Sequence, residues 1–373
     1  MLLRAFFIVL LLSFAVPHAS YAKPPSISAD AAVMMDEKTG RLYFEKNPLK
    51  QRPPASLTKI MTAIIALENS SPGDVVTVSK NAASVYEGQT ISLRTGDKIT
   101  LDNLLKAALV YSANNSTVAI AEHVAGSEKI FLEMMNEKAR LIGAVNTHFT
   151  NTNGYTHPNH YSTACDLALI TRYALNNPAF RKYVRSKEAN VEWIEPKKSE
   201  KINSTNRLLG GSYPGIEGVK TGSTSAAGNC LIVLANRDGR SLITVVLDCY
   251  DRYQDTMAVL DYGFNQIVSL ELCSTDKTSA YLPVRGGKES SVALVGEKNH
   301  TIDLLRSDLP MLKRKLDLVP DISAPVSYRQ KLGKESFYLG DRKLASIDLV
   351  AEKQIPRKGL GARLYEKIFG SQS

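Results

Sequence analysis

The stretch Pro54-Ala55-Ser56-Leu57-Thr58-Lys59-Ile60-Met61-Thr62 opens a run, residues 60–67, that is too apolar for one face of a surface helix. We interpret this run as a helix buried on all sides. Ser56 and Lys59 are three residues apart, so on a helix they project from the same face and can share a proton. A serine hydroxyl is a good nucleophile only if a base takes its proton, and a lysine is such a base only if its pKa is lowered. Because Ser-x-x-Lys also arises by chance on solvated helices, other parts of the chain must decide its meaning.

The composition indicates a globular protein. Its 373 residues exceed one typical domain of about 100–200 residues, so two domains are expected. The formal net charge of +9 is compatible with nucleic acid, an anionic membrane or an anionic polymer as neighbour. No run of Lys and Arg with interleaved aromatic residues occurs, so no nucleic-acid partner is expected.

The N-terminus has the pattern of a signal peptide. Arg4 precedes an apolar core, residues 5–16, and the small residues of Ser20-Tyr21-Ala22 form a cleavage site. We predict a signal peptide over residues 1–22. The alternative is an uncleaved anchor, but the apolar run is shorter than the roughly 20 residues that span a bilayer. The mature chain is therefore expected outside the cytoplasmic membrane, in the periplasm or cell-wall space.

Four cysteines are too few for a disulfide-stapled scaffold in an exported chain of this length. Cys230 and Cys249 lie on two apolar runs joined at Asp238-Gly239, which is a hairpin signal. A turn centred there would place the two cysteines near each other but not directly opposite. Two buried free thiols are therefore favoured over a disulfide.

The pattern of the first two thirds of the chain predicts an α+β fold of helices around antiparallel strands rather than alternating βαβ units. A polar pentad, residues 111–115, separates two apolar helical runs. The expected elements are a hairpin of residues 31–36 and 41–45, short strands within 75–100, helices over 104–110, 118–124, 128–142, 164–176 and 252–268, and strands at 219–222, 229–236 and 242–247.

Beyond Cys273 short alternating runs bounded by turn residues predict a small all-β domain. The expected organisation after the signal peptide is an α+β domain over residues 23–268, the all-β domain over 269–351 and a C-terminal tail over 352–373. His148, His157 and His160 lie close together in the sequence, but no cysteine or carboxylate completes a usual ligand set. We therefore expect no metal and no other cofactor.

Three polar motifs occur in order along the chain: Ser56-x-x-Lys59, Ser112-Ala113-Asn114 and Lys220-Thr221-Gly222. They fall on a helix, an interhelical segment and a strand. Attack by Ser56 on a carbonyl needs a base, for which Lys59 is the candidate. The leaving amine must then receive a proton, and Ser112, placed between Lys59 and Lys220, is the candidate that passes it on.

The remaining motif residues suit substrate binding. Asn114 can hold a substrate amide. Lys220 and the Thr221 hydroxyl offer a cation and a donor for a substrate carboxylate, and Gly222 lets a substrate backbone lie against the strand.

The trio resembles that of penicillin-binding proteins and class A β-lactamases. The chain is similar to the low-molecular-mass penicillin-binding proteins, serine-type D-alanyl-D-alanine carboxypeptidases. Within residues 143–166 the family's loop is matched by Thr147-His148-Phe149, Asn151, Gly154, His160, Ser162-Thr163-Ala164 and Asp166. Two positions depart from the family pattern: Ser223 stands where many relatives carry His, and Asn115 where many carry Asp.

The resemblance implies removal of the terminal D-alanine from peptidoglycan stem pentapeptides through a Ser56 acyl-enzyme. It also implies covalent inhibition by β-lactam antibiotics, and an oxyanion hole made by the backbone N–H groups of Ser56 and Ser223. Two alternatives stay open, a β-lactamase-like hydrolase and a non-catalytic cell-wall scaffold. The first lacks support because no Glu-x-x-Leu-Asn lies between Ser112 and Lys220, and the intact trio argues against the second.

The C-terminal tail is amphipathic. Leu360, Leu364 and Ile368 recur every four residues, while Arg357, Lys358, Arg363 and Lys367 add positive charge. This pattern is typical of a helix in an anionic membrane interface, and the resemblance supports it. We expect peripheral attachment to the outer face of the cytoplasmic membrane. The alternative is a helix packed on the all-β domain.

Overall fold

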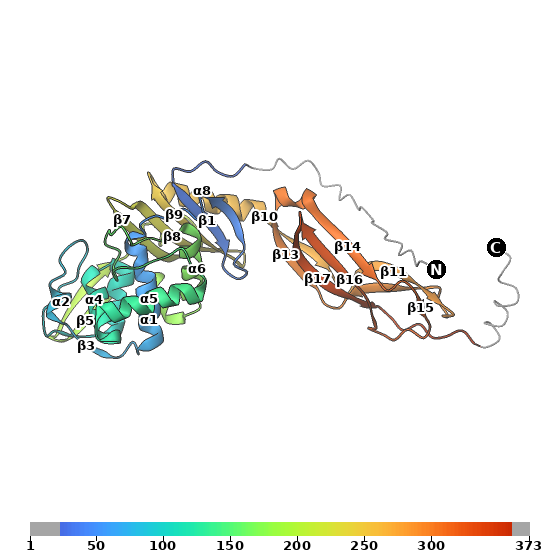
Figure 1. The fold of residues 1–373 in the computed structure, drawn as a ribbon, viewed down its shortest axis with the longest axis horizontal. Coiled ribbons are helices and arrows are strands. Elements are labelled where there is room, and N and C mark those ends of the chain that lie inside the picture. The colour runs from blue at the N-terminus through green and yellow to red at the C-terminus, as the bar shows by residue number, and fades with distance from the viewer. Residues whose placement is uncertain (1–22, 360–373) are drawn as a thin grey trace. The chain divides into compact units, whose positions relative to one another are not determined.

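The computed structural model describes residues 23–359, so the predicted signal peptide lies outside the described residues. The described chain forms two compact units (Figure 1). One is Lys23–Asn265 and the other begins at Gln266, beside the boundary predicted after residue 268. The predicted fold class, helices with antiparallel sheets followed by an all-β part, is confirmed.

A five-stranded antiparallel sheet forms the centre of residues 23–265, in the order β2-β1-β9-β8-β7. Arg237 pairs with Arg240, which places the β8–β9 turn at Asp238-Gly239 as predicted. The predicted first hairpin is also confirmed. The strands are β1 (Ala31–Asp36), β2 (Leu42–Lys46), β7 (Ile216–Thr224), β8 (Gly228–Arg237) and β9 (Arg240–Cys249).

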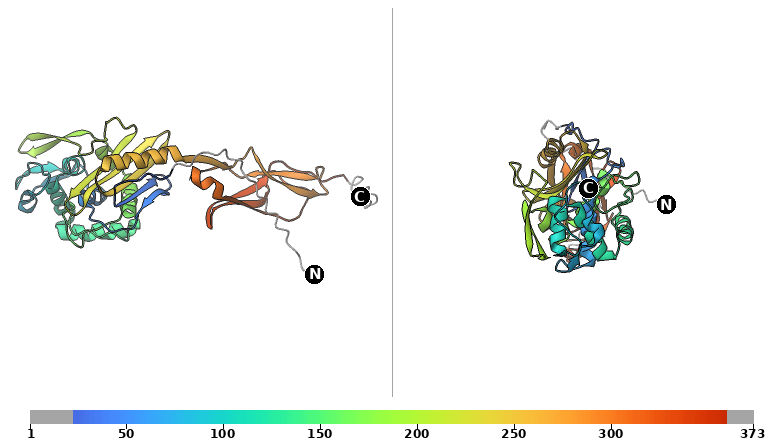
Figure 2. Two further views of the ribbon diagram at one scale, coloured as in Figure 1. Left: turned by 90° about the horizontal axis from the view of Figure 1, so that it is seen from above. Right: turned by 90° about the vertical axis from the view of Figure 1, so that its left-hand side faces the viewer.

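Successive side chains of a strand point to opposite faces of the sheet, and those of β1 are buried on both faces. Helices cover both faces of this sheet. Val33 and Met35 of β1 belong to the core that contains α1 (Lys59–Asn69) and α6 (Ala164–Ala174). On the other face lies α8 (Arg252–Gln266), drawn in gold in Figure 2. It packs so closely that a Cβ on its Gly263 would lie 2.4 Å from Met34 Sδ. Residues 60–66 of α1 are all buried, which confirms the prediction of a helix surrounded by protein.

A second, four-stranded sheet in the order β3-β4-β5-β6 lies at the periphery of this unit. Its last two strands were not predicted from the sequence. In β5 the buried Val191 and Trp193 alternate with the exposed Asn190, Glu192 and Ile194, and that pattern suits a strand with one exposed face. The elements not yet given are β3 (Val75–Thr77), α2 (Lys80–Ala83), β4 (Lys98–Thr100), α3 (Leu101–Lys106), the π-helical turn η2 (Ala107–Tyr111), α4 (Asn114–Ala125), α5 (Glu128–Ile142), α7 (Pro178–Val184), β5 (Glu188–Glu195) and β6 (Lys198–Asn203).

The second unit, as far as residue 359, is built from β-strands around a core that includes Val292, Leu294 and Leu349. A six-stranded sheet has the order β14-β16-β17-β12-β11-β15, and β10 pairs with β13. The helix predicted to reach residue 268 ends at Gln266, because β10 begins at Ile267 and pairs with β13. The strands are β10 (Ile267–Cys273), β11 (Thr278–Arg285), β12 (Ser291–Gly296), β13 (His300–Leu305), β14 (Leu312–Leu318), β15 (Ile322–Ser323), β16 (Lys331–Leu339) and β17 (Arg342–Ala351), with a 3₁₀ turn η3 (Arg306–Met311).

The beginning of the predicted tail belongs to this unit. Ile355 is fully buried and exchanges two backbone hydrogen bonds with Val326, each 2.9 Å long. Arg357 Nε donates to the carbonyl of Ala324. Leu360, Leu364 and Ile368, on which the amphipathic pattern depends, lie outside the described residues.

All four cysteines are free thiols, as favoured from the sequence for Cys230 and Cys249. Both of these side chains are buried, and Cys249 faces Asn229 across the β8–β9 pair. Burial raises the pKa of the Cys230 thiol to about 11 and that of Cys249 still further. Because a thiol that keeps its proton is a poor nucleophile, both cysteines act as small core side chains.

Candidate active site

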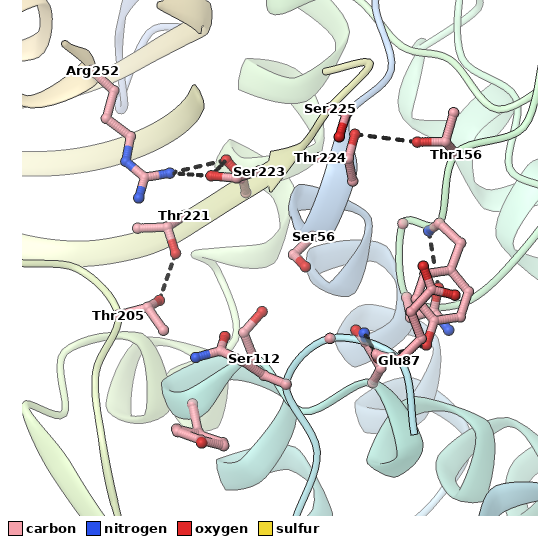
Figure 3. Close-up of a pocket in the computed structure, with 18 of the residues that line it drawn as sticks. Ser56, Glu87, Ser112, Thr156, Thr205, Thr221, Ser223, Thr224, Ser225 and Arg252 are labelled. Atoms are coloured by element: carbon pink, nitrogen blue, oxygen red, sulfur yellow. Dashed lines mark hydrogen bonds between the residues drawn. The ribbon is translucent and has the colours of Figure 1, made fainter. Parts of the chain in front are cut away.

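A cleft of about 1020 Å³ opens on the first unit, and all three predicted motifs meet there (Figure 3). Six of the eight predicted site residues line it: Ser56, Ser112, Asn114, Thr221, Gly222 and Ser223. The other two, Lys59 and Lys220, are buried beside it. The remaining walls come from residues 87–89, 153–156, 203–205 and 224–226, from Tyr111 and Arg207, and from the start of α8.

Ser56 lies on a short 3₁₀ turn, Ala55–Thr58, rather than on the α-helix itself. The turn runs directly into α1, whose first residue is Lys59. Residues three apart are eclipsed in a 3₁₀ helix, so the Ser-x-x-Lys spacing still places the two side chains together. Lys59 Nζ lies 2.9 Å from Ser56 Oγ.

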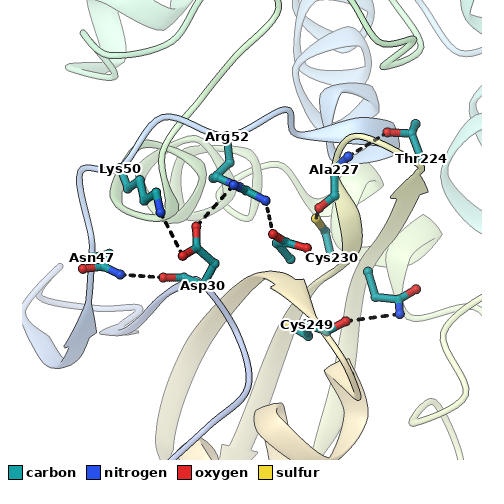
Figure 4. A network of polar contacts seen from close by, with 10 residues as sticks. Asp30, Asn47, Lys50, Arg52, Thr224, Ala227, Cys230 and Cys249 are labelled. Carbon is teal, nitrogen blue, oxygen red and sulfur yellow. Dashed lines mark hydrogen bonds and ion pairs between the residues drawn. The ribbon is translucent and has the colours of Figure 1, made fainter.

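The chain segment that leads into this turn is fixed to the end of the sheet by charges (Figure 4). Arg52 forms an ion pair with Asp248 at the end of β9 and a second one with Asp30, 3.4 Å away. Lys50 lies 2.9 Å from Asp30, whose pKa these cations lower. Because these residues come from distant parts of the sequence, only the fold reveals the anchor.

The Lys59 amine makes three close contacts in a site with no exposure to solvent. Besides Ser56, its Nζ lies 2.7 Å from Asn114 Oδ1 and 2.8 Å from the Asn153 carbonyl. Both of these oxygens can only accept hydrogen bonds. A neutral amine has two N–H donors and one lone pair, so its lone pair faces the Ser56 hydroxyl when both donors are engaged.

Burial, and secondly the nearby Lys220 cation, hold the pKa of Lys59 well below its usual 10.5. Both causes favour the neutral amine. The sequence required that a lysine acting as base have a lowered pKa, and Lys59 meets this requirement. Its amine is buried, faces a serine hydroxyl and directs its N–H donors toward other groups.

The predicted polar loop at residues 111–115 is shorter than expected. Only Ser112 and Ala113 separate η2 from α4, because Asn114 and Asn115 already form the first turn of the helix. Asn115 is buried and exchanges hydrogen bonds with the backbone of Ile91, which explains why polar residues begin a buried helix. Ser112 has a left-handed backbone, φ 73°, and this conformation turns the chain toward the cleft.

Asn114 has its side chain engaged at both ends. Its Oδ1 accepts from Lys59, and its Nδ2 donates to the Glu87 carbonyl at 2.8 Å. The predicted contact with a substrate amide would therefore be added to a role in holding Lys59. Gly88 is needed here, because a Cβ on it would lie 2.7 Å from Asn114 Nδ2.

On the opposite wall, β7 runs past the nucleophile. A Cβ on Gly222 would lie 3.1 Å from the Ser56 backbone nitrogen, so glycine allows strand and turn to approach closely. The Thr221 hydroxyl is 2.5 Å from that of Thr205. Lys220 is 1% exposed and donates to the Thr221 carbonyl at 3.0 Å, while burial, and secondly Arg252, lower its pKa to about 7.

Sequence reasoning missed Arg252. Of the described residues, Arg207 and Arg252 are the positively charged side chains that line the cleft. Arg252 Nη1 donates to the Gly222 carbonyl at 3.0 Å and to Ser223 Oγ at 2.9 Å (Figure 3). Its place at the start of α8 carries no motif, so nothing in the sequence signals that it reaches the third motif.

The sequence also carried no sign that Asn153 is a partner of Lys59, although the loop around it, within residues 143–166, matches the family. Within residues 23–359 no group of three or more His, Cys, Asp and Glu side chains has the arrangement of metal ligands. His160 instead hydrogen-bonds within the protein, to Thr58 and Thr150.

Comparison with known proteins gives the family. Residues 18–250 match a family described as D-alanyl-D-alanine carboxypeptidase, and residues 269–357 match the penicillin-binding protein 5 C-terminal domain. The chain is 32% identical over 340 residues to the D-alanyl-D-alanine carboxypeptidase DacF of Bacillus subtilis, covering 89% of this chain and 87% of that protein.

Solved structures agree with this match. Penicillin-binding protein 6B of Escherichia coli has a TM-score of 0.70 at 27% identity, covering 91% of this chain and 99% of that one. The Streptomyces K15 DD-transpeptidase has a TM-score of 0.62 at 30% identity, covering 65% of this chain and all of that one.

The fold and the cleft thus define a penicillin-binding serine hydrolase with an appended β domain. The chain belongs to the D-alanyl-D-alanine carboxypeptidase family, and its activity is that of a serine-type D-Ala-D-Ala carboxypeptidase.

Proposed function

We propose that Ser56 is the nucleophile of this carboxypeptidase and that Lys59 is its general base. The observation that carries the proposal is the Lys59 amine, buried with a lowered pKa, 2.9 Å from Ser56 Oγ. Lys59 takes the hydroxyl proton as the oxygen attacks the carbonyl of the penultimate D-alanine of a stem pentapeptide. The bond to the terminal D-alanine then breaks, and water releases the shortened peptide from Ser56.

Charge that develops on the substrate carbonyl oxygen needs donors in place before the reaction. We assign this role to the backbone N–H groups of Ser56 and Ser223. The close approach of Gly222 to the Ser56 nitrogen supports this assignment, because it brings strand β7 alongside the nucleophile. A backbone donor at position 223 does not depend on the side chain, so Ser is acceptable where many relatives carry His.

The leaving D-alanine amine must receive a proton. Ser112 lines the cleft, and we assign it the transfer of a proton between Lys59 and that amine, with Lys220 as the buried cation nearby. We assign the substrate's terminal carboxylate to the Thr221 hydroxyl and Arg252. The sequence-based prediction gave the cation's role to Lys220, but Arg252 lines the cleft whereas Lys220 is buried. Arg presents a planar donor fork that matches a carboxylate.

We propose that the protein acts on peptidoglycan after export, directed by the signal peptide over residues 1–22, and that β-lactams acylate Ser56. Peripheral attachment through residues 360–373, the part of the predicted tail beyond the anchor at Ile355 and Arg357, is part of the proposal. No helix within the described residues has the length and apolarity to cross a bilayer.

Labelling with a fluorescent penicillin tests the nucleophile. We expect the Ser56→Ala protein to lose labelling entirely and the Lys59→Ala protein to lose at least the roughly 10²–10⁴-fold typical of general base catalysis. Unchanged labelling of Ser56→Ala would show that the nucleophile is wrong.

Mass spectrometry of a pentapeptide digest by the parent protein separates the alternatives. Loss of one D-alanine indicates a carboxypeptidase. Rapid turnover of penicillin with an intact pentapeptide would indicate a β-lactamase-like hydrolase, and neither reaction would indicate a scaffold.

A further inference from the structure

A buried hydrogen-bond chain leads from the loop over residues 150–160 to the turn that carries Ser56. The Thr150 backbone N–H donates to His160 Nδ1 at 3.0 Å. His160 Nε2 lies 2.8 Å from Thr58 Oγ1, and that hydroxyl donates to the Ala55 carbonyl at 2.8 Å. Thr58 and His160 are 0% and 1% exposed, so water does not compete for these bonds.

The partners fix where each proton lies. A backbone N–H can only donate, so His160 Nδ1 accepts and the ring proton is on Nε2. Nε2 then donates to Thr58 Oγ1, and the Thr58 hydroxyl is free to donate to the Ala55 carbonyl. Burial, and secondly the neighbouring His148 and His157, lower the pKa of His160 to about 4, so the ring is neutral at neutral pH.

The carbonyl at the end of this chain belongs to a strained residue. Ala55 precedes Ser56 and has a φ of 49°, in the left-handed region that non-glycine residues rarely adopt. Such a conformation persists only where its surroundings hold it. The Ala55 carbonyl is held by the Thr58 hydroxyl and enclosed by Gly154, on which a Cβ would lie 1.9 Å from the oxygen.

The other end of the chain lies on the loop that orients Lys59. Residues 150–155 follow the Thr150 N–H, and the Asn153 carbonyl within them accepts from Lys59 Nζ. His160 therefore connects the turn that presents Ser56 to the loop that directs one N–H of Lys59 away from Ser56. Neither His160 nor Thr58 lines the cleft.

We propose that His160, acting through Thr58, is a positioning residue that keeps the Ser56 hydroxyl aligned with the lone pair of Lys59. The proposal rests on the roles of Ser56 and Lys59 proposed above. A histidine that only fills the core would act through packing, for example against Phe149, whose ring centroid lies 5.7 Å from that of His160, and not through the Nε2–H donor to Thr58.

Two substitutions at this position separate hydrogen bonding from packing. Gln carries its amide nitrogen about as far from the backbone as Nε2, whereas Asn reaches only about as far as Nδ1. His160→Gln keeps the donor to Thr58 but gives up the acceptor of the Thr150 N–H. His160→Asn keeps that acceptor and loses the donor to Thr58, and both remove the ring from Phe149. Because the proposal acts through Thr58, only the Asn variant loses the bond that matters. We expect the rate constant for acylation by a fluorescent penicillin, per titratable Ser56, to fall roughly 10²-fold in His160→Asn. It should stay within a few-fold of the parent in His160→Gln.

Thr58→Val removes the hydroxyl and keeps the shape of the side chain. We expect it to slow acylation about as much as His160→Asn, and the double variant to lose no more than either single variant, because both changes break the same connection. Thr171→Val is the matched control: Thr171 is also fully buried, but its hydroxyl donates to Leu167 of its own helix. It should leave the acylation rate unchanged.

All rates are measured on the full chain and normalised to the fraction that titrates, so partial unfolding does not count as slow chemistry. Equal rates for His160→Asn and His160→Gln, whether both normal or both slow, would overturn the proposal, as would a parent-like rate in Thr58→Val. If a His160 variant fails to fold, Thr58→Val against Thr171→Val decides. Persistent labelling of Ser56→Ala would instead refute the proposed nucleophile and is scored separately.

Discussion

At the residue scale, two buried lysines set the chemistry of the cleft. Lys59 and Lys220 are almost completely buried, and each has its pKa lowered first by burial and then by a neighbouring cation. Such a site opposes folding, since the unfolded chain binds protons that the folded chain gives up. The same feature makes one of the amines a base at neutral pH. The burial that leaves a lysine amine free to act as a base at neutral pH therefore also lowers the stability of the fold.

Replacing Lys220 by Met should stabilise the first unit. The pKa of Lys220 falls from 10.5 to about 7 on folding, so between these values stability rises with pH as the unfolded chain loses its extra proton. This shift corresponds to about 5 kcal/mol, from which loss of the Lys220 hydrogen bond to the Thr221 carbonyl subtracts about 1–3 kcal/mol. We therefore expect Lys220→Met to gain roughly 2–4 kcal/mol at about pH 7, and this gain should shrink toward pH ~10. Urea unfolding followed by the fluorescence of Trp193, the one tryptophan in the sequence, measures it. A gain of equal size at both pH values would contradict the assignment to Lys220 ionisation.

Arg252 should recognise the substrate's terminal carboxylate. We expect Arg252→Ala to raise KM for a pentapeptide substrate by roughly 10-fold or more, as loss of a charged hydrogen-bond partner would. Amidation of the peptide's C-terminus should weaken turnover by the parent far more than by Arg252→Ala. Turnover of the free and the amidated peptide by Lys220→Ala then shows which of the two cations, Arg252 or Lys220, binds the carboxylate. If only Lys220→Ala becomes indifferent to amidation, the carboxylate belongs to Lys220 as the sequence predicted.

At the scale of elements, the reactive geometry depends on the contact between a loop and a turn. Residues 150–155 pass directly over the 3₁₀ turn of Ser56, and Asn151 holds them in shape by accepting from the N–H groups of Gly154 and Tyr155. Glu128, at the start of α5, accepts from both the backbone and the side chain of Thr152. The loop is therefore a rigid part of the site although it has no regular secondary structure.

Gly154→Ala tests this contact. The new Cβ would lie 1.9 Å from the Ala55 carbonyl, and the residue has a φ of +97°, so both strain and collision are introduced. Gly143→Ala is the control, because Gly143 has a similar φ of +90° but no atom near the added Cβ. We expect the control to lose about 1 kcal/mol of stability with normal penicillin acylation. Gly154→Ala should lose more stability and at least about 10²-fold in acylation rate. Parent-like acylation by Gly154→Ala would show that the loop does not set the position of Ser56.

At the scale of the whole molecule, the chain combines a catalytic unit with a separate β unit. The cleft is built entirely within Lys23–Asn265. The second unit holds residues 355–358 against its strands through Ile355 and Arg357. An interfacial helix would therefore have to begin after this anchor.

Deleting residues 360–373 should abolish binding to anionic lipid vesicles while leaving penicillin acylation unchanged. Apolar residues recurring every four positions and nearby basic residues predict modest, partly electrostatic binding, which high salt should weaken. The deletion starts after Ile355 because that side chain is buried in the β unit. Co-sedimentation of the two forms, with neutral vesicles as the control, gives the answer. Equal binding of both forms, or binding by neither, would remove the membrane role from the tail.

Motifs that act through local spacing could be predicted from the sequence alone. The Ser-x-x-Lys spacing, the buried run after it and the hairpin at Asp238-Gly239 depend on residues close together in the chain, and the structure agrees with them. The order of the three motifs was sufficient to indicate the family and its activity. Strands β5 and β6 were missed because their charged, half-exposed pattern is weak without knowledge of the sheet that they extend.

Tertiary structure alone decided which groups surround the catalytic atoms. Asn153 reaches Lys59 through a backbone carbonyl, and sequence does not reveal where a carbonyl points. Arg252 reaches Ser223 because α8 starts beside the end of β7. Burial lowered both lysine pKa values, and burial is a property of the packed molecule. The sequence by itself thus determined the reactive residue types and their order, whereas the fold determined their protonation and orientation, because both depend on contacts between residues far apart in the chain.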